Sequence, residues 1–154
     1  MTNWKLFAEQ APDLSAAIEA RLRANKHHVL ATLRADGSPR VSGTEVELFG
    51  PLLVLGSMPG ARKVLDLRRD PRYALHSNPG DHTMAGGDAK ISGRARELLD
   101  AEKRAIRDAY PNDPGDDAEI FALDIEEAVL TTVDDDKLHV DLWRPGSPVT
   151  RFTR

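Results

Sequence analysis

Residues 52–77, LLVLGSMPGARKVLDLRRDPRYALHS, contain the order of signals that decides the fold. The apolar run 52–56 is typical of a short buried strand, and a turn rich in glycine follows it. A helical pattern over 62–69 ends at Asp70-Pro71, because the residue before a proline is disfavoured in the α region. A further strand, 72–77, follows directly. The segment therefore predicts two strands joined by a single short helix.

The residues before this segment predict one helix and a β-hairpin. Leu14, Ile18 and Leu22 recur at four-residue intervals after Pro12-Asp13, which favours a helix ending near residues 25–26. Two extended runs, 28–34 and 39–49, then flank Asp36-Gly37, a strong hairpin turn signal.

The residues after it continue the β pattern. A strand over 88–99 contains Gly93, which predicts a bulge or a close backbone approach. Asp100 is expected to cap a helix that runs to about residue 110, and two or three strands follow with turns at 134–137 and 144–148. We therefore expect a mainly β (α+β) fold, a small antiparallel barrel of six or seven strands with flanking helices. The sequence shows no linker, so residues 1–154 are expected to form one domain, with the helical segment 1–26 included.

Composition excludes several classes of protein. The 154 residues contain no cysteine, which rules out disulfides, thiolate zinc sites and cysteine nucleophiles. The net charge of −4 and the absence of a long basic run argue against nucleic-acid binding. No apolar run approaches the roughly 20 residues of a membrane helix, and the first residues lack a signal-peptide pattern, so a cytoplasmic location is expected.

The stretch GSMPGARK, residues 56–63, resembles a phosphate cradle, and three interpretations compete. A Walker P-loop is excluded because Val64 follows Lys63 where a Ser or Thr is needed, and because the glycine spacing is four instead of five. A tight turn with solvated cations is the second interpretation. The third is an anion site, because Arg62 and Lys63 face the positive end of the helix dipole and become favourable beside an anion. The residues alone leave the last two equally supported.

Three segments together resemble a known family: ATLRADGSPR, ARKVLDLRRDPR and GDAKISGRARELLD. They are similar in content and order to the pyridoxamine 5'-phosphate oxidase-like, FMN-binding split β-barrel family. This family includes enzymes that use the deazaflavin coenzyme F-420 and relatives that bind haem. The resemblance extends from about residue 25 to residue 100 and, more loosely, to residue 143.

The resemblance implies a set of cofactor-binding residues. Ser57, Arg62 and Lys63 match the positions that hold the flavin phosphate. Ser42 matches a position on the second strand that often carries Arg, and alternation places Thr44 on its face. A flavin-contacting Gln of the family is replaced by Asp88, with Lys90 on the same face. A homodimer that binds FMN, or alternatively F-420, is also implied.

The resemblance further implies an oxidoreductase that transfers a hydride to or from a small organic substrate. The C-terminal KLHVDLWRPGSPVTR lacks the Arg-x-His-x-Arg motif of true pyridoxamine phosphate oxidases, so vitamin B6 oxidation is not implied. A flavin carrier or sensor without turnover and a haem-binding relative remain alternatives.

Other residues have competing explanations. His76, Ser77 and the 79–87 loop are expected to border the substrate side, although His76 can equally be a strand-end residue bonded to backbone. Trp143 is either a core aromatic or a wall beside the flavin. His27 and His28 are expected to be partly exposed where the strand begins. No histidine pair has metal-site spacing, so no metal is expected and no catalytic acid or base is assigned.

Overall fold

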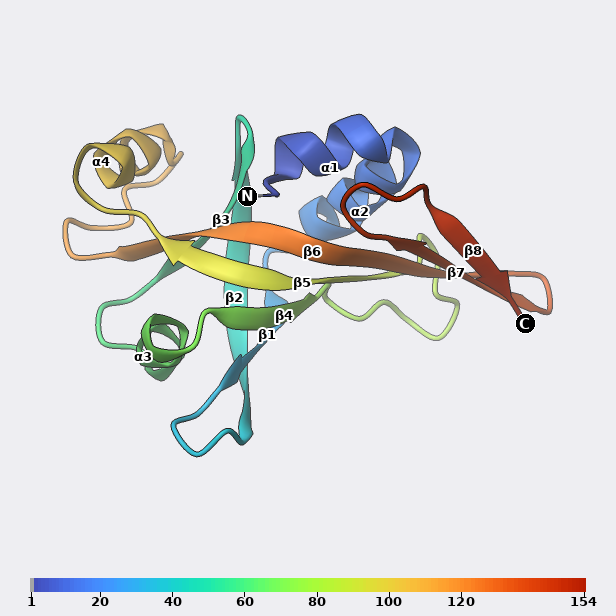
Figure 1. Ribbon diagram of the computed structural model, residues 1–154, viewed down its shortest axis with the longest axis horizontal. Helices are drawn as coiled ribbons and strands as arrows, with labels where there is room; N and C mark the ends of the chain where they lie inside the picture. Colours follow the sequence, from blue (N-terminus) through green and yellow to red (C-terminus); the bar gives the residue numbers. More distant parts are fainter. Residues whose placement is uncertain (1) are drawn as a thin grey trace.

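The computed structural model describes residues 2–154 as four helices and eight strands (Figure 1). The helices are α1 (Trp4–Gln10), α2 (Pro12–Ala24), α3 (Arg62–Arg69) and α4 (Asp100–Ala109). The strands are β1 (His28–Leu33), β2 (Pro39–Phe49), β3 (Leu52–Ser57), β4 (Arg72–His76), β5 (Asp88–Glu97), β6 (Glu119–Asp134), β7 (Lys137–Trp143) and β8 (Thr150–Thr153). The expected mainly β fold is confirmed.

Six of the strands close into a barrel. Their order is β3-β2-β1-β4-β5-β6, and β3 also pairs with β6, which closes the ring. Every pairing is antiparallel. Strands β7 and β8 continue outward from β6 and form an arm that ends at the C-terminus (Figure 1).

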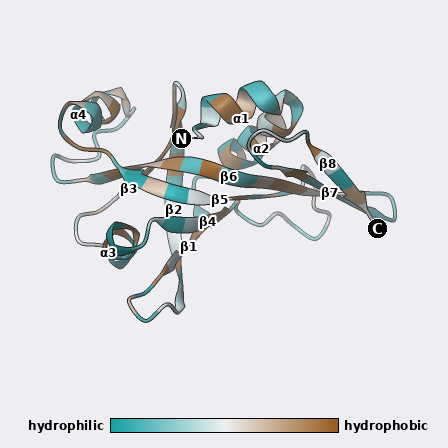
Figure 2. Cartoon of the chain, viewed as in Figure 1, coloured by the Kyte–Doolittle hydropathy of each residue, from teal (hydrophilic) through white to brown (hydrophobic). Residues whose placement is uncertain are grey.

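The inner face of the barrel wall is apolar. Register places five side chains in one row across β1, β4, β5, β6 and β7, and each is at most 2% exposed: Leu30, Leu75, Ile91, Ala128 and Trp143. Helices α1 and α2 pack against this core, and the Phe7 and Trp143 ring centroids lie 4.7 Å apart. In Figure 2, hydrophobic segments follow the barrel strands, whereas α3 is mostly hydrophilic.

Strand β5 contains the expected bulge. The register between β5 and β6 shifts between Ser92 and Gly93. A Cβ on Gly93 would lie 2.0 Å from the Asp124 carbonyl oxygen, so only glycine allows the two backbones to approach this closely.

Two local expectations need correction. The expected helical segment 1–26 contains two helices, whereas the sequence predicts only the one after Pro12, because the seven residues of α1 are too few for a clear helical period. Asn3 caps α1, and its Oδ1 accepts a bond from the Leu6 amide at 3.0 Å. The residue that caps α4 is Leu99, without a side-chain bond, and Asp100 begins the helix with φ of 53°. The carboxylate of Asp100 therefore lies in the first turn, where it still favours the helix dipole.

Candidate functional site

Helix α3 lies where β2 changes partners. Residues 39–44 of β2 pair with β1, and the pairing with β3 begins at Glu45. The chain leaves β3 at Ser57 and reaches α3 through a turn in which Gly60 has φ of 73°. The first turn of α3 is thereby placed beside the part of β2 that β3 does not pair with.

Lys63 connects α3 to β2 at this point. Its Nζ donates to the carbonyl oxygen of Gly43 at 3.0 Å, and its side chain is half-buried. Burial lowers the pKa of Lys63 below its ordinary value, and the charge of Glu45 partly opposes that shift. The ammonium group has two further N–H donors available for an incoming anion.

The N-terminus of α3 has no acidic residue of its own, although the Glu119 carboxylate accepts from the Gly60 amide at 3.3 Å just before it. Ala61 caps the helix without a side-chain bond, and the first turn has no acidic residue. The amides of Val64 and Leu65 donate to the Ala61 carbonyl oxygen, while within residues 2–154 no acceptor is found for the Arg62 and Lys63 amides. Free amides, a positive dipole end and the Lys63 ammonium group form an environment suited to an anion.

A buried carboxylate fixes α3 in this position. Asp66 is 2% exposed and accepts hydrogen bonds from Thr32 Oγ1 at 2.8 Å, Arg40 Nε at 2.6 Å and Arg69 Nη2 at 2.9 Å. Burial alone would raise the pKa of Asp66, but these bonds outweigh it and hold the pKa below its usual value. The ionised Asp66 therefore ties the helix to β1 and β2.

A row of side chains on the outer face of the sheet begins beside Lys63. Register aligns Gly43 with Val29, Val29 with His76, His76 with Lys90, and Lys90 with Val129. A cavity of about 280 Å³ lies over this row, and most of its lining is apolar: Val29, Ala31, Ala74, Leu75, His76, Lys90, Ile91, Ser92, Glu127 and Val129.

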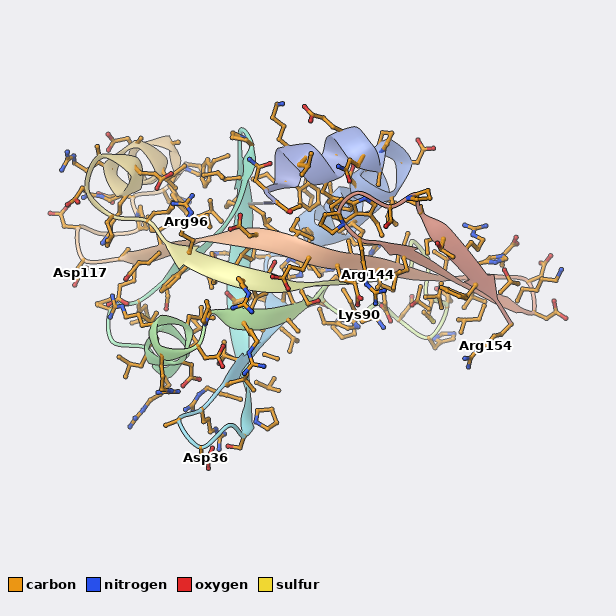
Figure 3. All side chains as sticks on the ribbon, viewed as in Figure 1. Asp36, Lys90, Arg96, Asp117, Arg144 and Arg154 are labelled. Carbon is orange, nitrogen blue, oxygen red and sulfur yellow. The ribbon has the colours of Figure 1, made fainter. Side chains whose placement is uncertain are left out.

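The residues predicted to contact the cofactor chain divide between the two faces of the sheet. Ser42 is opposite Leu30 and Thr44 is opposite His28, which places both on the inner face; Thr44 is 4% exposed. Asp88 and Lys90 point outward, and Figure 3 labels Lys90 near the N-terminal end of β5. Arg40, Ser42 and Thr44 share a face, as strand alternation predicts.

The residues predicted to border the substrate also lie in different parts of the structure. His76 lies on the outer face, and its Nδ1 donates to the Ser77 carbonyl oxygen at 2.5 Å, so in the neutral imidazole Nε2 is the nitrogen with the lone pair. Ser77 is buried, and its Oγ accepts from the Ala89 amide at 3.0 Å. Trp143 is fully buried against Phe7, which supports the core interpretation of this residue.

Arg62 points away from Lys63. It lines a second cleft of about 340 Å³ on the other side of α3, together with Arg34, Ala35, Asp36, Arg40, Leu65, Asp66 and Arg69. Ser57, the third predicted phosphate residue, ends β3 just before the turn, and its Oγ donates to the Met58 carbonyl oxygen at 3.2 Å.

The expectation that His28 is partly exposed is wrong. His28 is 3% exposed; its Nε2 donates to the Leu22 carbonyl oxygen, and its Nδ1 accepts from the Asn78 amide, both at 2.9 Å. The imidazole thus joins the end of α2 to the start of the 79–87 loop, which Arg21 also holds through Ala85 O at 3.1 Å. No sequence pattern indicates this role, because both partners are backbone groups and one of them, the Asn78 amide, is distant in the sequence.

The described part of the chain holds neither a metal cluster nor a membrane helix. Residues 2–154 contain no group of three or more His, Cys, Asp or Glu side chains placed to hold a metal ion. None of the helices described for this chain has the length and apolar character needed to cross a membrane.

Comparison with known proteins decides the family. The family model described as pyridoxamine 5'-phosphate oxidase matches residues 14–131, which is most of the chain. The chain belongs to the pyridoxamine 5'-phosphate oxidase family. The match covers β1 to β5, most of β6, α3 and the outer-face cavity, so the proposed resemblance is confirmed at the level of family. No curated protein matches this sequence.

Solved structures from several organisms share the fold of this family member. A haem-binding protein from Mycobacterium smegmatis is 23% identical with a TM-score of 0.63, over 84% of this chain and 58% of that protein. PhzG from Burkholderia lata 383, in complex with tetrahydrophenazine-1-carboxylic acid, is 15% identical with a TM-score of 0.62, over 96% and 91% of the two chains. A pyridoxamine 5'-phosphate oxidase-related, FMN-binding protein from Nostoc punctiforme PCC 73102 is 12% identical with a TM-score of 0.65, over 94% and 95%.

Proposed function

We propose that the protein is an oxidoreductase that binds FMN, or alternatively the deazaflavin coenzyme F-420, and transfers a hydride to or from a small organic substrate. The observation that carries this proposal is the position of Lys63. A half-buried ammonium group, beside the uncapped start of α3, lies at one end of an outer-face row that leads into an apolar cavity. Family membership, and the FMN-binding protein among the structural neighbours, support the cofactor class.

The phosphate is held at the first turn of α3. Lys63 Nζ and the amides of Arg62 and Lys63 donate to its oxygens, and Ser57 Oγ turns from Met58 to add one bond. The predicted side-chain contact of Arg62 is not part of this arrangement, because that side chain lines the cleft on the other side of α3. Asp66 keeps α3 in place, so the cation does not have to be positioned when the ligand arrives.

In this proposal, the polar chain and the ring of the cofactor would lie along the outer-face row. From Gly43 to Lys90 the row crosses three spacings between strands, or about 14 Å. A Cβ added to Gly43 would meet nothing within 4 Å, so the surface at this residue is open to a ligand. Val29, Ala31 and Val129 give the ring an apolar floor that excludes water, with His76 and Lys90 at its border. A bound flavin supplies the hydride chemistry itself.

Three predicted contacts fit this arrangement less well. Asp88 carries a carboxylate, which accepts hydrogen bonds but cannot donate them as Gln does. Ser42 and Thr44 lie on the inner face, so they support β2 from behind the row instead of facing it. The proposal therefore rests on Ser57, Lys63 and the α3 amides.

A homodimer is part of the proposal. Val41, Ala31 and Ala74 form a second outer-face row of small apolar residues, and Val41 is 72% exposed. Lys90 adds a positive charge to the same face, whereas Glu127 is already paired with Arg144 of its own chain at 2.7 Å. The cavity would then be closed by the partner subunit. Val41→Asp should yield monomers in analytical ultracentrifugation, while Leu99→Asp, at another exposed apolar residue, should not; dimers in both variants would contradict this part.

Ligand titration tests the proposed function. The apo-protein is titrated with FMN and with F-420 while the fluorescence of each is followed, and substrate-dependent oxidation of the reduced cofactor is then measured. We expect one of the two to bind at micromolar or lower concentration. Binding without any turnover would favour the flavin carrier or sensor, and no binding below millimolar concentration would refute the proposal.

Haem binding is the second candidate, and the geometry of His76 favours it. Its Nδ1 proton is held by the Ser77 carbonyl oxygen, which leaves the Nε2 lone pair toward the outer face, the usual arrangement of a metal-ligating histidine. Two structural neighbours are described as haem proteins, from Mycobacterium smegmatis and Vibrio cholerae. Titration with hemin should give a Soret shift that His76→Ala removes if this alternative holds.

A further inference from the structure

The cleft on the far side of α3 is lined by an unusual number of arginines. Arg62, Leu65 and Arg69 lie on one face of the helix. Arg34, which directly follows β1, and Arg40 of β2 approach from the β1–β2 hairpin. Figure 3 labels Asp36 at the tip of the β1–β2 hairpin, which forms one wall of the cleft. We refer to this hollow as the arginine cleft.

Only part of this positive charge is neutralised within the cleft. Four arginines and two aspartates line it, so its formal charge is +2, whereas the whole chain carries −4. Placing several cations close together costs electrostatic free energy unless an anion lies among them. The charge of the cleft therefore opposes that of the molecule.

Both carboxylates are already engaged. Asp36 Oδ1 accepts from the Ser38 amide at 2.9 Å and from Ser38 Oγ at 2.6 Å, which fixes the hairpin turn. Asp66 is buried and accepts from Thr32, Arg40 and Arg69. Neither is free to swing toward the outer arginines.

Two guanidinium groups remain without a protein acceptor. Across residues 2–154, neither the Arg34 nor the Arg62 side chain makes a hydrogen bond or ion pair, whereas Arg40 and Arg69 are held by Asp66. Arg40 uses Nε for this bond and Arg69 uses Nη2, so each keeps further N–H groups for a ligand. Arg40 and Arg69, which Asp66 holds in place, give the cleft a rigid base. The unpaired side chains of Arg34 and Arg62 can close over a bound anion.

We propose that the arginine cleft is an anion-binding site, separate from the site at Lys63, for a small dianion such as a phosphomonoester or a dicarboxylate. The formal charge of +2 matches a dianion, and guanidinium forks bind both phosphate and carboxylate oxygens in pairs. Leu65 is 44% exposed and lies with Ala35 in the lining, which suits a short aliphatic portion. The site recognises an acidic substrate or effector and does not depend on which cofactor the protein binds.

Calorimetric titration with inorganic phosphate and, separately, with succinate tests the site. Measurements are made at low ionic strength, because salt screens exposed charges. Arg34→Gln removes a cleft cation that has no structural contact, and Arg104→Gln removes an exposed arginine of α4 as the matched control. Lys63→Gln separates the cleft from the proposed cofactor site.

We expect at least one dianion to bind, and Arg34→Gln to weaken it about five-fold or more. Arg104→Gln and Lys63→Gln should leave that binding unchanged, and Arg34→Lys should retain part of it. The proposal is overturned if neither dianion binds, or if Arg34→Gln behaves like the Arg104→Gln control. Binding that disappears in Lys63→Gln alone would also overturn it, because the anion would then occupy the start of α3.

Discussion

The two faces of the barrel wall use the same strands for different purposes. On the inner face, the row from Leu30 to Trp143 is closed to solvent, and all of its side chains except Ala128 are large. On the outer face, the neighbouring row from Gly43 to Val129 is lined by smaller side chains, with His76 and Lys90 between them, and it lies under an open cavity. Stability therefore depends mainly on the inner row, which leaves the outer row free to bind a ligand. Adjacent residues of one strand can separate these two roles.

The largest difference in the loss of stability is expected between alanine substitutions at Ile91 and at Lys90. Ile91→Ala removes buried volume from the inner row and should lower the free energy of unfolding by about 2–5 kcal/mol. Lys90→Ala, on the outer row of the same strand, should change it by about 0.5 kcal/mol or less. Urea unfolding measures both, and equal losses would mean that the two faces contribute alike.

Two glycines give the next comparison. Gly93→Ala would place a Cβ 2.0 Å from the Asp124 carbonyl oxygen and should destabilise the protein by about 1–3 kcal/mol. At Gly43 nothing lies within 4 Å of such a Cβ, so Gly43→Ala should be near neutral in thermal unfolding. It should instead weaken cofactor binding, because the methyl group stands on the outer row. A neutral Gly93→Ala would contradict the bulge as a close backbone approach.

The smallest expected effect is the contribution of His28 to the pH dependence of the free energy of unfolding. His28 is a buried structural residue, whereas His76 lies on the outer face. Burial lowers the pKa of His28 below its ordinary value of 6.5, and the carbonyl groups of Leu22 and Asn25 only partly oppose this. The unfolded chain therefore binds more protons as the pH falls below 6.5, and the free energy of unfolding decreases there. One proton limits this slope to about 1.4 kcal/mol per pH unit.

The variant His28→Gln provides the matched control for this pH dependence. A glutamine can donate to Leu22 and accept from Asn78 without titrating. The decline in stability below pH 6.5 should therefore be shallower in the variant. Identical pH profiles of the two proteins would show that His28 does not titrate on unfolding.

Local signals made much of the fold predictable. The hairpin at Asp36-Gly37, the bounds of α3 and the bulge at Gly93 all follow from turn residues, proline and glycine. Helix α1 was not predictable in the same way, because its stability comes from packing Trp4 and Phe7 into the core.

The candidate site was less predictable than the fold, because it depends on register and on distant contacts. Alternation within β2 and β5 grouped Ser42 with Thr44 and Asp88 with Lys90, but only strand pairing shows that the groups lie on opposite faces. Likewise, the cations Arg62 and Lys63 are adjacent in sequence, yet they point to different sides of α3. Sequence alone could not separate them.

The central claim is that Lys63 binds a cofactor phosphate at the point where β2 leaves β3. The most direct measurement compares the affinity for FMN with that for riboflavin, which lacks the phosphate, in the natural protein and in Lys63→Ala. If the deazaflavin binds instead, F-420 and its phosphate-free chromophore form the equivalent pair. We expect the natural protein to prefer the phosphorylated ligand by at least about ten-fold and Lys63→Ala to lose about 1.5–3 kcal/mol of this preference. Equal affinities in the natural protein, or an unchanged preference in Lys63→Ala, would contradict the claim.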